Sequence, residues 1–155
     1  MTAREYLSQY ISAQAEIETL TEEIQRIRSL AEKITVAFDS TGGSSGTPNQ
    51  SKIEVCVDKI LETEDKIRTR TAELGEIRDR VYETIKSVQD SRLRVILMKR
   101  YIGNESFEKI STETGYTYNH IVRALHPEAL AEVEKLLQNE NIPQNPIESH
   151  NDSVV

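Results

Sequence analysis

The chain has 155 residues, enough for one ordinary domain or two small ones. Charged residues make up 29% and hydrophobic residues 37% of it, and it contains no Trp. Such a composition is lean for a globular core and favours long helices that share a narrow apolar seam. The net charge of −7 argues against a protein that coats nucleic acid or a membrane through bulk charge, although a sequence-specific DNA reader needs only a basic docking face.

Cysteine usage and hydropathy exclude several further classes. Cys56 is the single cysteine, so neither an intramolecular disulfide nor a cysteine-rich zinc site can form. The chain begins without the apolar run of a signal peptide, and it has no stretch of about 18 apolar residues that would span a membrane. We therefore expect a cytoplasmic protein with no membrane partner.

The first predicted element is a long helix that ends near Phe38. Its apolar residues follow one another at alternating steps of four and three, and polar residues fill the positions between them: Tyr6, Tyr10, Ala13, Ile17, Leu20, Ile24, Ile27, Ala31, Ile34 and Phe38. This is the spacing of a coiled-coil seam, kept over more than four heptads. One such helix cannot bury its own stripe and needs a partner.

A second long helix follows a glycine- and serine-rich stretch, for which we predict a loop over residues 39–50. Its main apolar column recurs every seven residues: Ile53, Ile60, Ile67, Leu74, Val81 and Val88. A poorer companion column begins at Val57 and ends at Ile85, with Glu64 and Thr71 between them and Ile77 off its register. We expect residues 1–90 to fold as an antiparallel coiled-coil hairpin in an all-α protein. Pairing between two chains, which would give a homodimer, is the alternative.

Residues 91–137 change pattern and predict short helices. Asp90 or Ser91 can cap a helix that ends at Gly103-Asn104, and Ser106 can cap the next one. Gly115 breaks that helix, and Thr117 can cap its successor. Because Pro127 suits the first turn of a helix, we expect one helix to end near His126 and another to begin at residue 128. Residues 138–155 are expected to be a disordered tail.

The stretch around Gly115 meets the requirements of a helix-turn-helix. Two short helices that cross closely need a small residue where they meet, here Ser111, and a left-handed residue at the turn, here Gly115. Apolar residues must hold the second helix down, and Ile110, Tyr116 and Ile121 are placed for that task. A helical cap that merely packs on the coil is the alternative interpretation.

In a helix-turn-helix the second helix enters the major groove, and its exposed first turns meet bases and phosphates. Asn pairs well with adenine, and Arg with guanine or a phosphate. No acidic residue occurs from Gly115 to Pro127, although residues 91–137 hold seven Lys or Arg and six Asp or Glu. The predicted DNA-binding residues are Thr117, Tyr118, Asn119, His120, Arg123, Arg100 and Lys109, and Arg92, Arg94 and Lys99 are further candidates for phosphate contacts.

Nothing in the sequence indicates catalysis. His120 and His126 lie six residues apart without a nearby cysteine, which is not a recognised zinc spacing, and we expect both to lie on the surface or to face the groove. No carboxylate pair or nucleophile–base set stands in a plausible pocket. We therefore expect neither an enzyme nor a cofactor or metal.

Four segments in the C-terminal part of the chain carry a resemblance to known proteins. The promoter-binding C-terminal region of bacterial sigma factors resembles residues 92–101, reading RLRVILMKRY, and the later segments 106–111, Gly115-Tyr116 and 123–126. The layout over residues 2–137 resembles small phage and prophage proteins of Gram-positive bacteria, which join a coiled-coil hairpin to a sigma-like helix-turn-helix. The sequence departs from the sigma pattern at Asn119, where Arg is common, and at Pro127. The resemblance implies a late transcription regulator.

The sequence is compatible with three candidate functions. The first is a transcriptional regulator that binds double-stranded DNA and contacts host RNA polymerase through the acidic coil. The second is a DNA-packaging accessory similar to a small terminase subunit, in which the coil drives ring assembly. The third is a structural coiled-coil adaptor.

Overall fold

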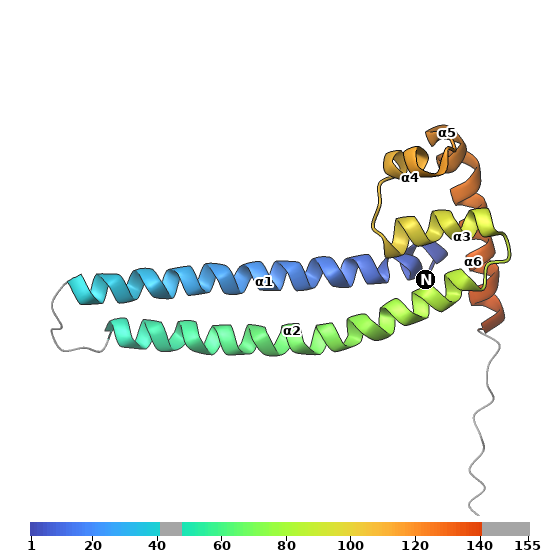
Figure 1. Cartoon of the computed structure of the whole chain (residues 1–155). Coiled ribbons are helices and arrows are strands. Elements are labelled where there is room, and N and C mark those ends of the chain that lie inside the picture. The colour runs from blue at the N-terminus through green and yellow to red at the C-terminus, as the bar shows by residue number, and fades with distance from the viewer. Residues whose placement is uncertain (41–47, 141–155) are drawn as a thin grey trace, which may run out of the picture.

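The computed structural model describes residues 1–40 and 48–140 of the chain. Two long helices, α1 (Ala3–Ser40) and α2 (Pro48–Lys86), lie side by side and run in opposite directions (Figure 1). The remaining helices gather at the end of this hairpin where α1 begins and α2 ends. No strand occurs in the described residues, so the prediction of an all-α fold with a helical hairpin is confirmed there.

The seam of the hairpin follows the predicted column of α2 that begins at Ile53, but its companion column lies one residue earlier than predicted. Ile77 is 8% exposed and belongs to the seam, whereas Val57 is 47% exposed. The companion residues recur every seven positions, and all are buried except the half-buried Arg70: Cys56, Thr63, Arg70, Ile77 and Thr84. Each polar member has a partner, which is why a polar residue is tolerated here.

Hydrogen bonds and one ion pair supply the partners of these three polar residues. Thr63 Oγ1 donates to the carbonyl of Lys59 at 2.8 Å. Thr84 Oγ1 lies 3.0 Å from the hydroxyl of Tyr6 on α1. Arg70 reaches across to Glu16 with an Nε–Oε2 distance of 2.7 Å. The apolar pattern alone could not identify this column because three of its five members are polar.

The ends of the two long helices also differ from the prediction. Residues 39–40 and 48–50, which we assigned to the loop, are helical, and the rest of the predicted loop lies outside the described residues. Pro48 can begin α2 because the first helical turn does not need its missing N–H.

The C-terminal module, residues 91–140, contains two helices that include a π-helical turn. The first joins α3 (Ser91–Leu97) to η1 (Met98–Ile102). After it come α4 (Phe107–Thr114) and a second long helix made of α5 (Tyr118–His120), η2 (Ile121–Leu125) and α6 (His126–Glu140).

The expected break at Pro127 is therefore wrong, because His126 is helical and the chain runs straight into α6. The N–H of His126 donates to the carbonyl of Ile121, five residues back, so the helix widens just before the proline. A widened turn gives the proline ring room and absorbs the missing backbone donor. The same helix also continues three residues past the predicted boundary at Leu137, since no helix breaker occurs before Glu140; residues 141–155 lie outside the described residues.

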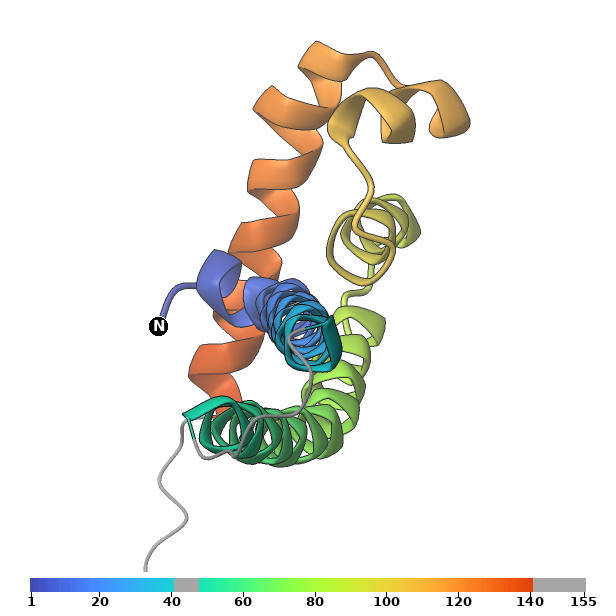
Figure 2. The same ribbon diagram turned by 90° about the vertical axis from the view of Figure 1, so that its left-hand side faces the viewer.

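One hydrophobic core joins the hairpin to the module across the predicted boundary at residue 90. Leu7 of α1 and Ile85 of α2 belong to the same buried cluster as Leu93, Ile110 and Val133 of the module. Figure 2 shows α6 running past the base of both long helices. The carboxylate of Glu134 on α6 accepts a hydrogen bond of 2.8 Å from the backbone N–H of Ala3, at the start of α1. The hairpin base and the module thus pack as one unit.

Across the described ranges, no helix combines the length and the apolar character that crossing a bilayer requires.

The position of the seam predicts opposite effects of two alanine substitutions on α2. Ile77→Ala should lower the free energy of unfolding by about 2–3 kcal/mol because it empties a buried site. Val57 lies in the companion column predicted from the sequence, and Val57→Ala should change the free energy of unfolding by less than about 0.5 kcal/mol. Urea denaturation followed by circular dichroism measures both. Equal losses, or a larger loss at Val57, would contradict this register.

Candidate nucleic-acid interface

A three-residue turn joins α4 to the helix that begins at Tyr118. Gly115 adopts a φ of +78°, and its N–H donates to the carbonyl of Ser111 at 3.0 Å. A Cβ at this glycine would meet open space, so the left-handed backbone, not crowding, is what favours glycine. The hydroxyl of Ser111 donates to the carbonyl of Tyr116 at 2.6 Å and ties the end of the turn back to α4. The left-handed backbone predicted for Gly115 agrees with this geometry, and Ser111 adds a hydrogen bond that its small size did not indicate.

The two helices on either side of the turn begin as predicted. The hydroxyl of Ser106 accepts a hydrogen bond of 3.2 Å from the N–H of Lys109, which caps α4. The hydroxyl of Thr117 accepts one of 3.2 Å from the N–H of His120, which caps the next helix. Because both caps satisfy backbone donors that the helices leave unpaired, they fix where each helix starts.

The helix after the turn has one buried face and one exposed face. Ile121 and Leu125 are buried in the core of the module. Five predicted DNA-binding residues are exposed at its start: Thr117, Tyr118, Asn119, His120 and Arg123. Arg123 forms no ion pair with any residue that the structure describes. The segment around it, from Gly115 to Pro127, contains no Asp or Glu. The structure therefore brings together exposed polar side chains from a segment that contains no Asp or Glu.

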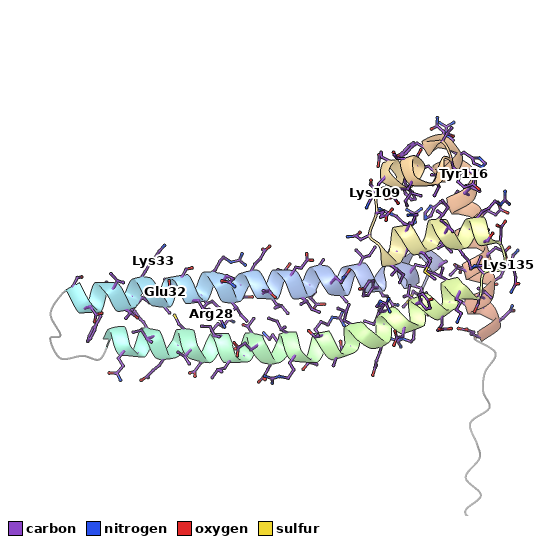
Figure 3. The ribbon with its side chains drawn as sticks, viewed as in Figure 1. Arg28, Glu32, Lys33, Lys109, Tyr116 and Lys135 are labelled. Carbon is purple, nitrogen blue, oxygen red and sulfur yellow. The ribbon has the colours of Figure 1, made fainter. Side chains whose placement is uncertain are left out.

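Lys109, by contrast, already has acidic partners. Its Nζ lies 3.6 Å from Glu105 and 3.7 Å from Glu113. Lys99 bonds to Glu113 and lies 3.8 Å from Glu105, and the bond to Glu113 raises the pKa of Lys99. Figure 3 shows Lys109 and Tyr116 at the module end of the molecule, far from Arg28 and Lys33 on the hairpin. Two lysines and two glutamates thus balance one another at this edge of α4, which weakens the case for phosphate contacts there.

The three arginines proposed for phosphate contacts beside Lys99 hold local structure. Arg100 donates to the carbonyl of Glu105 at 2.9 Å, and its guanidinium lies 4.7 Å from the centre of the Phe107 ring. Arg94 donates to the carbonyls of Val88 and Gln89. The positive charge of these arginines is evident from the sequence. The backbone carbonyls that they bind are not, because no residue pattern marks a backbone acceptor.

Arg92 is held as well, in this case by the N-cap of its own helix. It makes two side-chain bonds to the carboxylate of Asp90, of 3.2 and 2.8 Å. Asp90 also accepts from the backbone N–H of Arg92 at 2.9 Å, and these bonds keep the pKa of its carboxyl below the ordinary value. The charge of Arg92 is therefore largely matched.

His126 is buried, contrary to the expectation that it lies on the surface or faces a groove. Its Nε2 lies 2.9 Å from the hydroxyl of Tyr101, and its ring meets Phe107 edge-on with centroids 4.9 Å apart. Burial, and then the charges of Arg4 and Arg100, lower the pKa of His126 to about 4. The helix continues through Pro127 and turns this side chain inward. The predicted helix break near His126 did not indicate this burial.

The described side chains also bear on metal binding. No group of three or more His, Cys, Asp or Glu residues lies close enough to hold a metal ion within residues 1–40 and 48–140. In comparisons with known proteins, no family model, curated protein or solved structure matches the chain.

The buried His126 predicts that acid weakens the fold. The unfolded chain takes up this proton near the ordinary pKa of 6.5 and the folded chain near 4, so stability is lost as the pH falls from 6.5 through 4. Urea unfolding at several pH values should give a steeper loss for the wild type than for His126→Gln, which cannot take up the proton. Carboxylates titrate in both proteins and cancel in the difference. Parallel curves would contradict this role of His126.

Proposed function

We propose that the chain is a sequence-specific DNA-binding transcriptional regulator of the phage or prophage type, with α4 and the helix from Tyr118 acting as a helix-turn-helix. The observation that carries the proposal is the exposed, acid-free start of the second helix, held on a buried scaffold directly after a left-handed glycine turn. In this proposal the helix lies in the major groove of double-stranded DNA. The resemblance to sigma-factor regions and late phage regulators favours the same function.

Asn119 and Arg123 are the proposed base-contacting pair. They lie four residues apart on one helix, so their side chains lie on neighbouring turns of the same face. Asn can bond adenine at two atoms, and Arg can do the same with guanine. Thr117, Tyr118 and His120 flank them and are proposed to contact the sugar–phosphate backbone.

The hairpin is the proposed protein-binding part. Residues 1–90 hold 12 Lys or Arg and 17 Asp or Glu, so this arm repels DNA and is suited to a basic protein surface. We propose host RNA polymerase or a second copy of the chain as its partner. Since residues 91–137 carry a net charge of only +1, one module alone should bind DNA weakly and with a strong salt dependence.

The proposal predicts a graded response to three alanine substitutions. On a site selected from random DNA, Arg123→Ala should weaken binding by about tenfold or more, the cost of one bidentate base contact. Lys109→Ala should weaken it by less than about threefold, because Glu105 and Glu113 already offset this charge. Lys135→Ala is the matched control, since Lys135 pairs with Glu132 on the far part of α6. Fluorescence anisotropy at fixed salt measures all three.

Circular dichroism should be unchanged in these variants, because each side chain is exposed. If Arg123→Ala binds the selected site as tightly as the wild type, the helix that begins at Tyr118 is not the DNA recognition helix. If the wild type selects no sequence at 50 mM salt, the adaptor function replaces the regulator.

The mass of the protein in solution separates regulation from packaging. A regulator should be a monomer or dimer by light scattering at micromolar concentration, with a dimer matching a two-fold symmetric DNA site. A ring of eight or more subunits would contradict the regulator and favour the packaging accessory.

A further inference from the structure

A cavity of about 180 Å³ lies where the hairpin meets the module. We name it the junction cavity: it is bounded by the first turns of α1, the end of η1 with the residues that follow it, and the starts of α4 and α6. Its volume is several times the roughly 30 Å³ that one water molecule occupies in the liquid. A small ion with a few water molecules therefore fits.

The walls of the junction cavity carry two positive charges and no carboxylate. Arg4 comes from α1 and Arg100 from η1, and no Asp or Glu is among the lining residues. Within the described part of the chain the Arg4 side chain forms no hydrogen bond or ion pair. Arg100 is held by a neutral carbonyl and an aromatic ring, neither of which cancels its charge. Both guanidinium groups thus keep an unmatched positive charge beside the same space.

Neutral hydrogen-bonding groups complete the lining. The hydroxyls of Ser8 and Ser12 on α1 and the amide of Asn104 line the cavity together with the two arginines. Hydroxyls, amides and guanidinium groups are the donors that bind oxyanions in proteins, and arginine matches the geometry of phosphate and carboxylate best. The donor set is therefore that of an anion site.

The positive charges of Arg4 and Arg100 also act on the buried side chains of His126 and Tyr101. Burial has the largest effect on both groups and lowers the pKa of His126 but raises that of Tyr101, whereas the charges of Arg4 and Arg100 lower both pKa values. No carboxylate from α1, η1, α4 or α6 acts on either group. A bound anion would compensate these positive charges.

We propose that the junction cavity binds a small oxyanion, inorganic phosphate or the phosphate group of a small molecule, between Arg4 and Arg100. The anion offsets the repulsion between the two guanidinium groups and links the first turn of the hairpin to the module. Because Arg4 belongs to α1 and Arg100 to η1, occupancy stabilises the angle at which the hairpin leaves the module. This inference does not depend on DNA binding, and its test uses none until a final arm.

The test is a titration of the full-length protein with potassium phosphate, balanced with KCl to constant ionic strength. Phosphate should raise the melting temperature of the wild type, and the pKa of His126, followed by NMR of the imidazole, should move up toward its ordinary value. Arg4→Gln should weaken the apparent phosphate affinity by at least about tenfold, the effect of losing a charge-assisted bond. Arg26→Gln, an exposed arginine farther along α1, is the matched control and should respond as the wild type does.

Arg4 is exposed, and within the described residues its side chain forms no hydrogen bond or ion pair, so Arg4→Gln should keep the fold, which circular dichroism verifies. If Arg4→Gln responds to phosphate as the wild type does, or if phosphate leaves the wild type unchanged, the proposal is overturned. In a final arm, duplex DNA replaces phosphate. If the duplex moves the His126 signal and free phosphate does not, the cavity takes a phosphate of the DNA backbone and the assignment to a small free anion is wrong.

Discussion

The packing of α6 against the base of the hairpin is the interaction on which the rest of the structure depends. A two-helix hairpin buries each seam from one side, and most of its seam residues stay half-buried along its length. The large buried cluster lies where α6 packs, with Leu7, Ile85 and Val133 among its members. Glu134 then caps the first N–H of α1. The module thus supplies the third layer that the hairpin lacks, and the hairpin ends supply part of the module's core.

The parts of this fold that could be predicted are those whose cause lies in neighbouring residues. The heptad column from Ile53 and the caps at Ser106 and Thr117 depend on chain spacing of a few residues, and the structure has them where the sequence indicated. The left-handed turn at Gly115 belongs to the same class, because the need for a positive φ is local.

The parts that could not be predicted depend on contacts made across the fold. The companion column of α2 contains Thr63, Arg70 and Thr84, so hydrophobicity favoured the exposed Val57 over the buried Ile77. Each polar member is satisfied by a group that the pattern does not contain: a carbonyl, a tyrosine hydroxyl or a glutamate on the opposite helix. His126 was misplaced for a similar reason, since its burial follows from a helix that continues through Pro127.

That continuity also bears on how the proposed function operates. The helix that carries Asn119 and Arg123 at its start carries Val133 and Glu134 at its end, where it contacts the hairpin. A helix transmits a displacement along its axis because its backbone bonds resist bending, and a widened turn such as η2 is where such a helix bends most easily.

One helix therefore joins the proposed DNA-binding surface to the acidic hairpin. Its widened turn η2, just before Pro127, is the place where this helix bends most easily. In the proposed function, a partner that tilts the hairpin would act on Asn119 and Arg123 through α6. The junction cavity lies beside the widened turn, with His126 in its wall. The charges that surround His126 are thus placed to influence the angle between the two parts of the molecule.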